Sequence, residues 1–228
     1  LILAATLILI FLKPDPYLLA RTEANIDTDQ KAVKTRVAFK IVRSEPKALL
    51  GLTSVVIGHI AMVTIMVMTP VHMGHVDVAL RLIGLVISVH VLGMYAFSPL
   101  IGKLTDQIGR EKTIILGALI LLLAALVSGL AYADAVFQLG VGLFLLGLGW
   151  SMTMIAGSTL LAESVPLEGK AASQGLSDLL MNGGGALGGA IAGLIIAFSS
   201  YGWLCALVTL PVAFLLFKAV GQVRLLQA

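Results

Sequence analysis

The sequence predicts an all-α fold, a polytopic membrane helix bundle with six transmembrane helices. Its 228 residues are 59% hydrophobic and only 12% Asp, Glu, Lys or Arg, whereas a soluble domain carries about 25% charged residues. The mean hydropathy is +1.04, and long stretches contain no charged residue. This composition excludes a soluble enzyme, a disordered chain and a secreted disulfide scaffold, and the single cysteine, Cys205, cannot form an internal disulfide.

Charge-free stretches locate the helices, because a span needs roughly 20 apolar residues to cross about 30 Å of hydrocarbon. Residues 48–76 exceed one crossing, so we expect an outer loop to begin near Thr69 and Pro70. Residues 179–217 suit two helices, divided by a turn at residues 199–202. The six predicted spans are 49–68, 82–101, 113–132, 136–161, 172–198 and 202–218.

The segments outside the spans complete the predicted organisation. Residues 1–12 are expected to be the end of a truncated transmembrane helix, since the chain opens in an apolar stretch without an initiating Met or a basic leader. Residues 13–48 form a basic linker, residues 49–218 the six-helix transmembrane bundle, and residues 219–228 a tail. The chain is therefore expected to be a fragment of a longer protein.

The distribution of basic residues predicts the orientation. Of the fifteen Lys and Arg residues, all but Arg81 fall on one side of the predicted spans. Lys and Arg are enriched in cytoplasmic loops, so this side, including the C-terminus, is predicted to be cytoplasmic and the protein to lie in the cell membrane. The opposite ends of the spans carry aromatic residues, as expected for an interfacial belt: Tyr132, Phe137, Tyr201 and Trp203.

One part of the basic linker has a helical pattern. The segment KAVKTRVAFKIV places Val33, Val37 and Ile41 at helical spacing among basic residues. Such a basic amphipathic helix can lie on the anionic inner leaflet of a membrane. The alternative is a charged linker without specific contacts.

A short motif, GKLTDQIGREK at residues 102–112, joins the second and third predicted spans. Gly102 permits a close turn, and Asp106 offers a carboxylate. Gly109 with Arg110 reverses the chain and places a cation at the lipid headgroups. We therefore interpret Gly102, Asp106, Gly109 and Arg110 as a compact functional loop.

This motif resembles the G-x-L-x-D-[RK]-x-G-[RK]-[RK] loop of the major facilitator superfamily, a large class of secondary transporters. The matching residues are Gly102, Leu104, Asp106, Gly109 and Arg110, while Gln107 and Glu111 depart from the pattern. In that family a weaker form of the loop lies between helices 8 and 9. The resemblance implies that the six spans are helices 7–12, one half of a twelve-helix major facilitator fold, with residues 1–12 ending helix 6. The alternative is an unrelated polytopic protein with an accidental turn.

The resemblance also gives Asp106 a role. In the family, such a carboxylate lies against a helix end in the opposite half and holds the cytoplasmic gate shut. A carboxylate near a helix N-terminus gains about 0.3–1 kcal/mol, which suits a latch that must open. A simple loop cap is the alternative.

Residues 172–198 combine a glycine face with an acid. Glycines four residues apart let two helices approach closely, so they predict helix packing or a moving gate surface: Gly184, Gly185, Gly188, Gly189 and Gly193. Asp178 is the one acid well inside a span, and Asn182 lies one turn away. An intramembrane acid is costly, so this pair is a candidate for coupling or gating, with a hydrogen-bonded structural acid as the alternative.

Two further spans carry residues that could face a substrate. The resemblance implies that the span with His59 lines the central cavity, and Trp150 stands at mid-span, where tryptophan is less expected than at an interface. The cavity candidates are His59, Met62, Met66, Trp150, Thr153 and Met154. Core packing is the alternative for each, and His90 is more simply a hydrogen-bonded core histidine.

No motif predicts an enzyme. His72 and His75 form an H-x-x-H near Asp77, but a short exposed loop is a poor metal site, and no protease, hydrolase or nucleotide-binding motif is present. We therefore predict no cofactor, no metal and no nucleic-acid partner.

The resemblance implies a secondary active transporter that works by alternating access, and on that basis we expect export of small amphipathic organic compounds in exchange for protons. Its partners are then a small-molecule substrate, protons, membrane lipid and the missing N-terminal half. Export is favoured because no span interior contains the Lys or Arg that a charged metabolite would require. The alternatives are a proton symporter of a small metabolite and a non-transporting receptor or assembly protein on the same fold.

Overall fold

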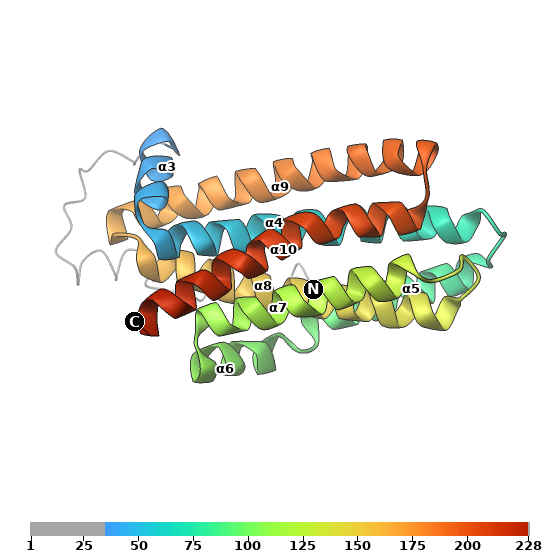
Figure 1. The fold of residues 1–228 in the computed structure, drawn as a ribbon, viewed down its shortest axis with the longest axis horizontal. Coiled ribbons are helices and arrows are strands. Elements are labelled where there is room, and N and C mark those ends of the chain that lie inside the picture. The colour runs from blue at the N-terminus through green and yellow to red at the C-terminus, as the bar shows by residue number, and fades with distance from the viewer. Residues whose placement is uncertain (1–34, 228) are drawn as a thin grey trace, which may run out of the picture. The chain divides into compact units, whose positions relative to one another are not determined.

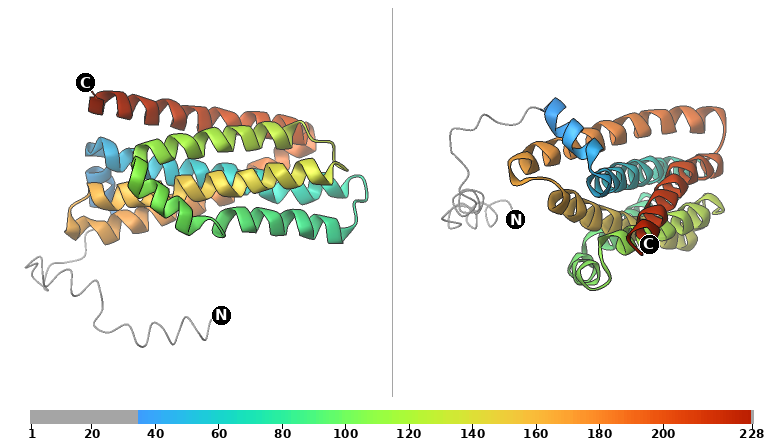
Figure 2. Two further views of the ribbon diagram at one scale, coloured as in Figure 1. Left: turned by 90° about the horizontal axis from the view of Figure 1, so that it is seen from below. Right: turned by 60° about the vertical axis from the view of Figure 1, so that its left-hand side comes forward.

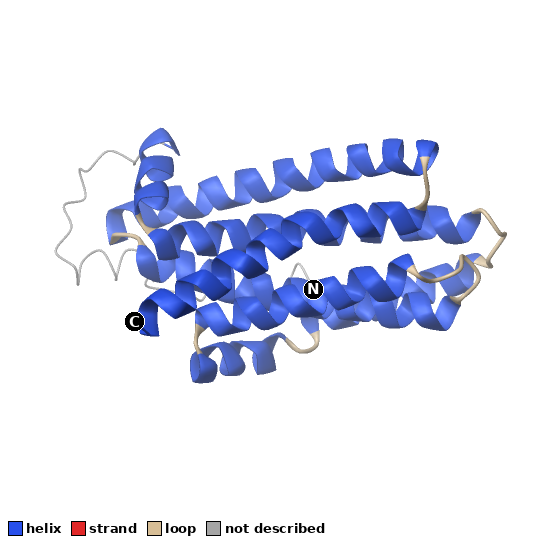
Figure 3. Ribbon diagram, in the orientation of Figure 1, coloured by secondary structure: helices blue, strands red, loops and turns tan. Residues whose placement is uncertain are grey.

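The computed structural model describes residues 35–227, so the expected helix end at residues 1–12 and the first part of the linker lie outside the described residues. All regular structure in the described part is helical (Figure 3). The elements are α3 (Thr35–Ser44), α4 (Pro46–Gly74), α5 (Leu80–Tyr95), α6 (Ser98–Ile108), α7 (Arg110–Gly129), α8 (Val136–Ser164), α9 (Leu167–Phe198) and α10 (Tyr201–Gln227). Six segments are long and apolar enough to cross a membrane, with α5 and α6 together forming one of them. The predicted all-α fold with six membrane-spanning segments is confirmed.

The long helices run side by side and alternate in direction (Figures 1 and 2). One end of the bundle holds α3, the α6–α7 and α8–α9 connections and the end of α10. The other end holds the α4–α5, α7–α8 and α9–α10 connections. The segments rich in Lys and Arg therefore lie together at one end, which we call the basic end.

Helix α8 is the centre of the bundle and packs against α4, α5 and α7. Its glycines lie against the neighbouring backbones: a Cβ on Gly157 would lie 2.9 Å from the carbonyl oxygen of Gly51, and one on Gly149 would lie 3.0 Å from that of Gly117. A Cβ on Gly147 would likewise meet the backbone of α5 at His90 and Gly93. Helix axes can approach this closely only where side chains are absent, so glycine fixes the three contacts.

The outer loop expected near Thr69 and Pro70 is wrong, because α4 continues to Gly74. Thr69 and Met73 are fully buried. Because Thr69 Oγ1 donates to the Ile65 carbonyl oxygen, it accepts a hydrogen bond from the Tyr201 hydroxyl on α10 at 2.8 Å. These contacts hold the last turns of α4 in the bundle. Proline inside a membrane helix is tolerated when neighbouring groups satisfy the freed backbone.

The second span is broken, although the sequence predicts one helix over residues 82–101. Helix α5 ends at Tyr95, and α6 begins at Ser98 with Pro99 in its first turn. Proline has no N–H to donate and disfavours a helical residue before it, which accounts for the break.

The turn expected at Gly102 is also wrong. Gly102 lies inside α6, and a Cβ there would meet open space. The chain reverses at Gly109 alone, whose φ of 94° lies in the region that favours glycine. The motif is therefore a helix end and a one-residue turn, rather than a loop of eleven residues.

Helix α3 lies across the basic end of the bundle (Figure 1). Its buried residues are Ala38 and Val42, and Ile41 reaches Gly169 at the start of α9. Val37, expected on the apolar stripe, is 46% exposed, and Val33 lies outside the described residues. The expected helix exists with a rotated apolar face, and the alternative of a linker without specific contacts is wrong.

Candidate functional site

Three rings from three helices meet halfway along the bundle. Trp150, midway along α8, donates its Nε1–H to Nδ1 of His59 on α4 at 3.3 Å, and the ring centroids are 6.3 Å apart. Tyr95, the last residue of α5, contacts Trp150 edge to face with centroids 6.0 Å apart. Trp150 is 9% exposed and Tyr95 59% exposed. We call His59, Tyr95 and Trp150 the aromatic cluster.

Tyr95 is the member of this cluster that sequence reasoning missed. An aromatic residue in the interior of a predicted span, four residues before a proline, was the available signal. That signal was not used, because the predicted span runs unbroken over residues 82–101 and gives Tyr95 no distinct position within it.

The other predicted cavity residues differ in their exposure. Met62 is buried in the core, and Met66 and Met154 pack against that core while partly exposed. Thr153 is fully buried and donates to the backbone oxygens of Gly149 and Trp150. The structure thus brings His59 and Trp150 together and places Met62 and Thr153 within the bundle.

The glycine face of α9 is turned toward α4. A Cβ on Gly184 would lie 2.8 Å from Ile60 Cδ1, and one on Gly185 would lie 2.9 Å from Cδ2 and 3.1 Å from Nε2 of His59. Gly188 lies similarly close to the Thr64 hydroxyl. Gly189 is at ordinary contact distance from α4, and Gly193 faces open space. Four of the five predicted glycines therefore contact α4, three of them too closely for a Cβ, and Gly185 leaves room for the His59 ring.

Asp178 and Asn182 are both exposed on α9. The Asn182 amide donates to the main-chain oxygen of Asp178 at 2.8 Å, and not to its carboxylate. Within residues 35–227 the Asp178 carboxylate forms no ion pair. It is therefore available to groups outside the described chain.

At the basic end, Arg110 ties the motif to α8. Its guanidinium donates to both carboxylate oxygens of Glu163, at 2.8 and 3.0 Å, and to the Thr105 carbonyl oxygen at 3.2 Å. It also pairs with Asp106 at 3.1 Å, whose side chain remains 73% exposed. Glu163, at the end of α8, was missed because its partner lies 53 residues away in the chain.

A second, longer ion pair at the same end joins Glu111 to Lys47 at the start of α4, at 3.8 Å. Gln107 and Glu111 are the two residues at which the motif departs from the pattern that it resembles. Glu111 has a charged partner within the bundle, Lys47. The turn at Gly109 is consequently linked to both α8 and α4.

The opposite end is built from rings and hydroxyls. Tyr132, Phe137 and Trp203 are 80%, 85% and 65% exposed, as expected for an interfacial belt. Tyr201 is only 3% exposed, so its place in that belt is wrong. Its hydroxyl reaches Thr69, and its ring stacks on His72 with centroids 4.4 Å apart.

The first histidine of the H-x-x-H pair, His72, contacts neighbouring groups, since its ring stacks on Tyr201. His72 Nε2 lies 3.3 Å from the Ala131 carbonyl oxygen. Among the described residues, no three His, Cys, Asp or Glu side chains come close enough to hold a metal ion. His90 is fully buried and donates from Nδ1 to the Leu143 carbonyl oxygen at 2.8 Å.

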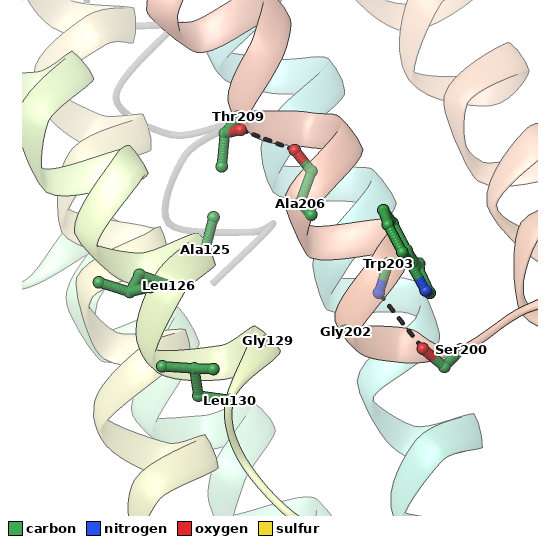
Figure 4. A pocket seen from close by; sticks show the side chains of 9 residues that line it. All are labelled: Ala125, Leu126, Gly129, Leu130, Ser200, Gly202, Trp203, Ala206 and Thr209. Carbon is green, nitrogen blue, oxygen red and sulfur yellow. Dashed lines mark hydrogen bonds between the residues drawn. The ribbon is translucent and has the colours of Figure 1, made fainter.

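Two cavities lie away from the aromatic cluster. One of about 480 Å³ lies between α7 and α10, lined by Leu126, Leu130 and Trp203 among others (Figure 4). Another of about 480 Å³ lies between α5 and α8 and is lined by apolar residues such as Leu85 and Phe144. Neither contains a residue of the predicted site.

Comparison with known proteins agrees with the topology. Residues 52–224 match the family model of the Major Facilitator Superfamily. Over 97% of its length the chain is 36% identical to the uncharacterized MFS-type transporter YddS of Bacillus subtilis strain 168, covering 52% of that protein. It is also 36% identical to the uncharacterized MFS-type transporter YdeG of the same organism, over 92% of this chain and 50% of YdeG.

A third relative, from Brucella anthropi, is named riboflavin transporter RfnT. It is 31% identical over 72% of this chain and 40% of its own length. The chain spans about half the length of the first two relatives. With six membrane-spanning segments, the Gly109 turn and the family match over most of its residues, this chain belongs to the Major Facilitator Superfamily.

Proposed function

We propose that this chain is the C-terminal half of a secondary active transporter that works by alternating access and exports small amphipathic organic compounds in exchange for protons. The observation that carries the proposal is the aromatic cluster, which stands midway along the helices, the depth at which transporters bind their substrates. A partly exposed tyrosine, an indole and an imidazole give this site an apolar surface with few hydrogen-bonding groups. Such a surface suits an amphipathic ligand.

The missing N-terminal half is proposed to complete the site. Helix α9 exposes large apolar side chains along its length, among them Leu179, Leu187 and Leu194, and α5 exposes Leu85 and Leu92. Because the relatives are about twice as long as this chain, a second bundle is available to cover part of these faces. Lipid would cover the rest.

Flux measurement tests the transport function directly. The full-length protein is reconstituted into liposomes, a pH gradient is imposed, and the movement of a fluorescent amphipathic compound is followed. We expect the compound to move opposite to the protons, and only when the gradient is present. Movement in the same direction as protons would support the symporter alternative, and absence of any flux would support a non-transporting protein on the same fold.

The relative named as a riboflavin transporter favours the small-metabolite alternative, which requires that this protein and that relative share a substrate. The same liposomes decide between the two, because riboflavin can replace the amphipathic compound in the assay. Riboflavin flux without flux of other amphipathic compounds would replace the export proposal.

We assign Asp106 the role of a latch at the cytoplasmic gate. Its side chain is 73% exposed although Arg110 is within 3.1 Å, so one carboxylate oxygen remains for a helix end in the missing half. In the full-length protein, Asp106→Asn should shift the population toward inward-open states and lower flux while leaving membrane insertion intact. Unchanged flux together with unchanged cysteine accessibility from the cytoplasm would contradict the latch.

The orientation and the role of α3 are proposed together. Arg36, Lys40 and Arg43 are exposed on α3, which contains no acidic residue. If the basic end is cytoplasmic, these side chains reach the anionic headgroups of the inner leaflet. Replacing all three with Gln should weaken the dependence of flux on phosphatidylglycerol content, and an unchanged dependence would contradict this role.

A further inference from the structure

The aromatic cluster has a chemistry that narrows the class of ligand. We propose that it binds a flat, uncharged heteroaromatic ring system that carries a carbonyl acceptor, and that Gly185 of α9 keeps His59 in position for it. The inference rests on the proposed function and names the substrate class of that same site. Tyr95 and Gly185 enter as specificity-determining residues.

The rings supply the surface for a flat ligand. Tyr95 meets Trp150 edge to face at 6.0 Å and keeps 59% of its surface exposed. Aromatic rings prefer edge-to-face or offset-stacked partners at centroid distances of about 4.5–7 Å. The exposed surface of Tyr95 is therefore free to take a further ring.

His59 supplies one directed donor. Because Trp150 donates its only N–H to Nδ1 of His59 at 3.3 Å, that nitrogen acts as an acceptor. A neutral imidazole with Nδ1 as acceptor carries its proton on Nε2. Among residues 35–227 no group accepts a hydrogen bond from Nε2. The cluster thus presents an N–H from His59 and a hydroxyl from Tyr95, and both can donate to a carbonyl oxygen.

Formal charges stand apart from this donor pair. On the span of Tyr95 the nearest is Lys103, eight residues further on and about 12 Å away along the helices. On α4 the nearest charged side chain is Lys47, about 18 Å from His59 along the helix, and on α8 it is Glu163, about 20 Å from Trp150. Asp178 is about 10 Å from Gly185 along α9. An ion bound at the cluster would find no counter-ion in contact, so an uncharged ligand is favoured.

Gly185 couples α9 to this arrangement. A Cβ there would lie 2.9 Å from Cδ2 and 3.1 Å from Nε2 of His59, so alanine would push the imidazole away from its place beside Trp150. Gly193, two turns further along the same helix, has nothing within 4 Å of a Cβ. Glycine at position 185 is therefore needed for the ring geometry, whereas glycine at position 193 is not.

The test measures binding to the purified full-length protein in lipid nanodiscs by equilibrium dialysis. Three probes separate the features of the ligand. Acridone is flat, uncharged and has a carbonyl group, proflavine is flat but cationic at neutral pH, and hydrocortisone is uncharged and has carbonyl groups but no aromatic rings. We expect acridone to bind about tenfold more tightly than either of the other two.

Paired variants assign the preference to the named residues. Tyr95→Leu should weaken acridone binding by about 3- to 10-fold, whereas Tyr132→Leu, the same change at an exposed outer position, should not alter it. Gly185→Ala should weaken acridone binding by about threefold or more, and Gly193→Ala should leave it unchanged. Tyr95→Leu and Gly185→Ala should each weaken acridone binding more than hydrocortisone binding.

The proposal is overturned if acridone does not bind, if proflavine or hydrocortisone binds as tightly, or if either pair of variants behaves alike. These outcomes are separate from those of the flux assay. Proton-driven export of other compounds with no acridone preference would support the transport function and contradict the proposed substrate class. The expected pattern of acridone binding without any flux would support the binding site and contradict the transport function.

Discussion

Helices α8 and α9 are both long and rich in glycine, yet they use glycine in opposite ways. Buried residues make up 61% of the most apolar stretch of α8, against 11% for α9. On α8, Gly149 and Gly157 lie against backbone atoms of α7 and α4. On α9, Gly185 and Gly188 lie against side chains of α4, namely His59 and Thr64.

This difference separates a fixed contact from an adjustable one. A backbone cannot move aside without displacing its helix, whereas a side chain can change rotamer. Helix α8 is also tied at its end, because Glu163 pairs with Arg110 through two hydrogen bonds. We therefore infer that α8 holds the bundle together, while α9 is the helix with room to shift, as the proposed alternating access requires.

The largest effect is expected where the fixed contact is broken. In Gly157→Ala the new methyl group would lie 2.9 Å from the Gly51 carbonyl oxygen and 3.1 Å from Ser54 and Val55. Overpacking of this kind costs about 1–3 kcal/mol, so the melting temperature of the full-length protein in detergent should fall. Gly140→Ala is the control, because a Cβ at this position of the same helix would meet open space. Its melting temperature should stay unchanged. Equal melting temperatures of the two variants would contradict the inference that α8 makes the fixed contacts.

The same substitution on α9 should cost less. In Gly188→Ala the methyl group would meet Thr64 Oγ1 at 2.8 Å and Ile60 Cγ2 at 3.2 Å, and both side chains can move. We expect a loss of about 1 kcal/mol, measured by the same thermal melt. A loss as large as that of Gly157→Ala would show that the α4–α9 contact is as rigid as the α4–α8 contact.

The ion pair between Glu163 and Arg110 at the end of α8 should contribute still less to stability. Glu163→Gln keeps the shape of the side chain and removes the charge that faces Arg110. Because the pair is partly exposed, at 24% and 52%, we expect about 0.2–1 kcal/mol, and the effect should shrink in high salt. Glu168→Gln, at an exposed position in the first turn of α9, provides the control for a lost charge. A change equal to that of the control would mean that the ion pair does not fix α8.

The sequence was sufficient for the fold class because membrane spans are long and their apolar composition is distinctive. It failed at Thr69 because that helix end depends on what packs against it, here Tyr201. It failed at Pro99 because proline is tolerated inside many membrane helices, so a proline alone does not predict a break. It could not reveal the α8 glycine contacts either, since a glycine in an apolar span looks the same whether it meets a backbone or open space.

For the candidate site, the sequence identified single residues but not their partners. His59 and Trp150 were singled out separately, and only the fold brings them to hydrogen-bonding distance. Tyr95 and Glu163 were missed because each acts through a residue at least 53 positions away. Long-range pairing of this kind leaves no periodic signal in the sequence.

The smallest effect on stability, and the sharpest on function, is expected at Asp178. Its carboxylate is exposed on α9 and forms no ion pair within residues 35–227, so Asp178→Asn should leave the melting temperature unchanged. If α9 is the helix that moves, a carboxylate on its exposed face passes between two environments in each cycle, and its charge is costly in the apolar one. Asparagine keeps the shape and removes that charge. In liposomes the full-length variant should therefore lose flux driven by a pH gradient, while exchange of substrate without a gradient persists. Transport against a gradient at the level of the parent protein would instead place proton coupling outside Asp178.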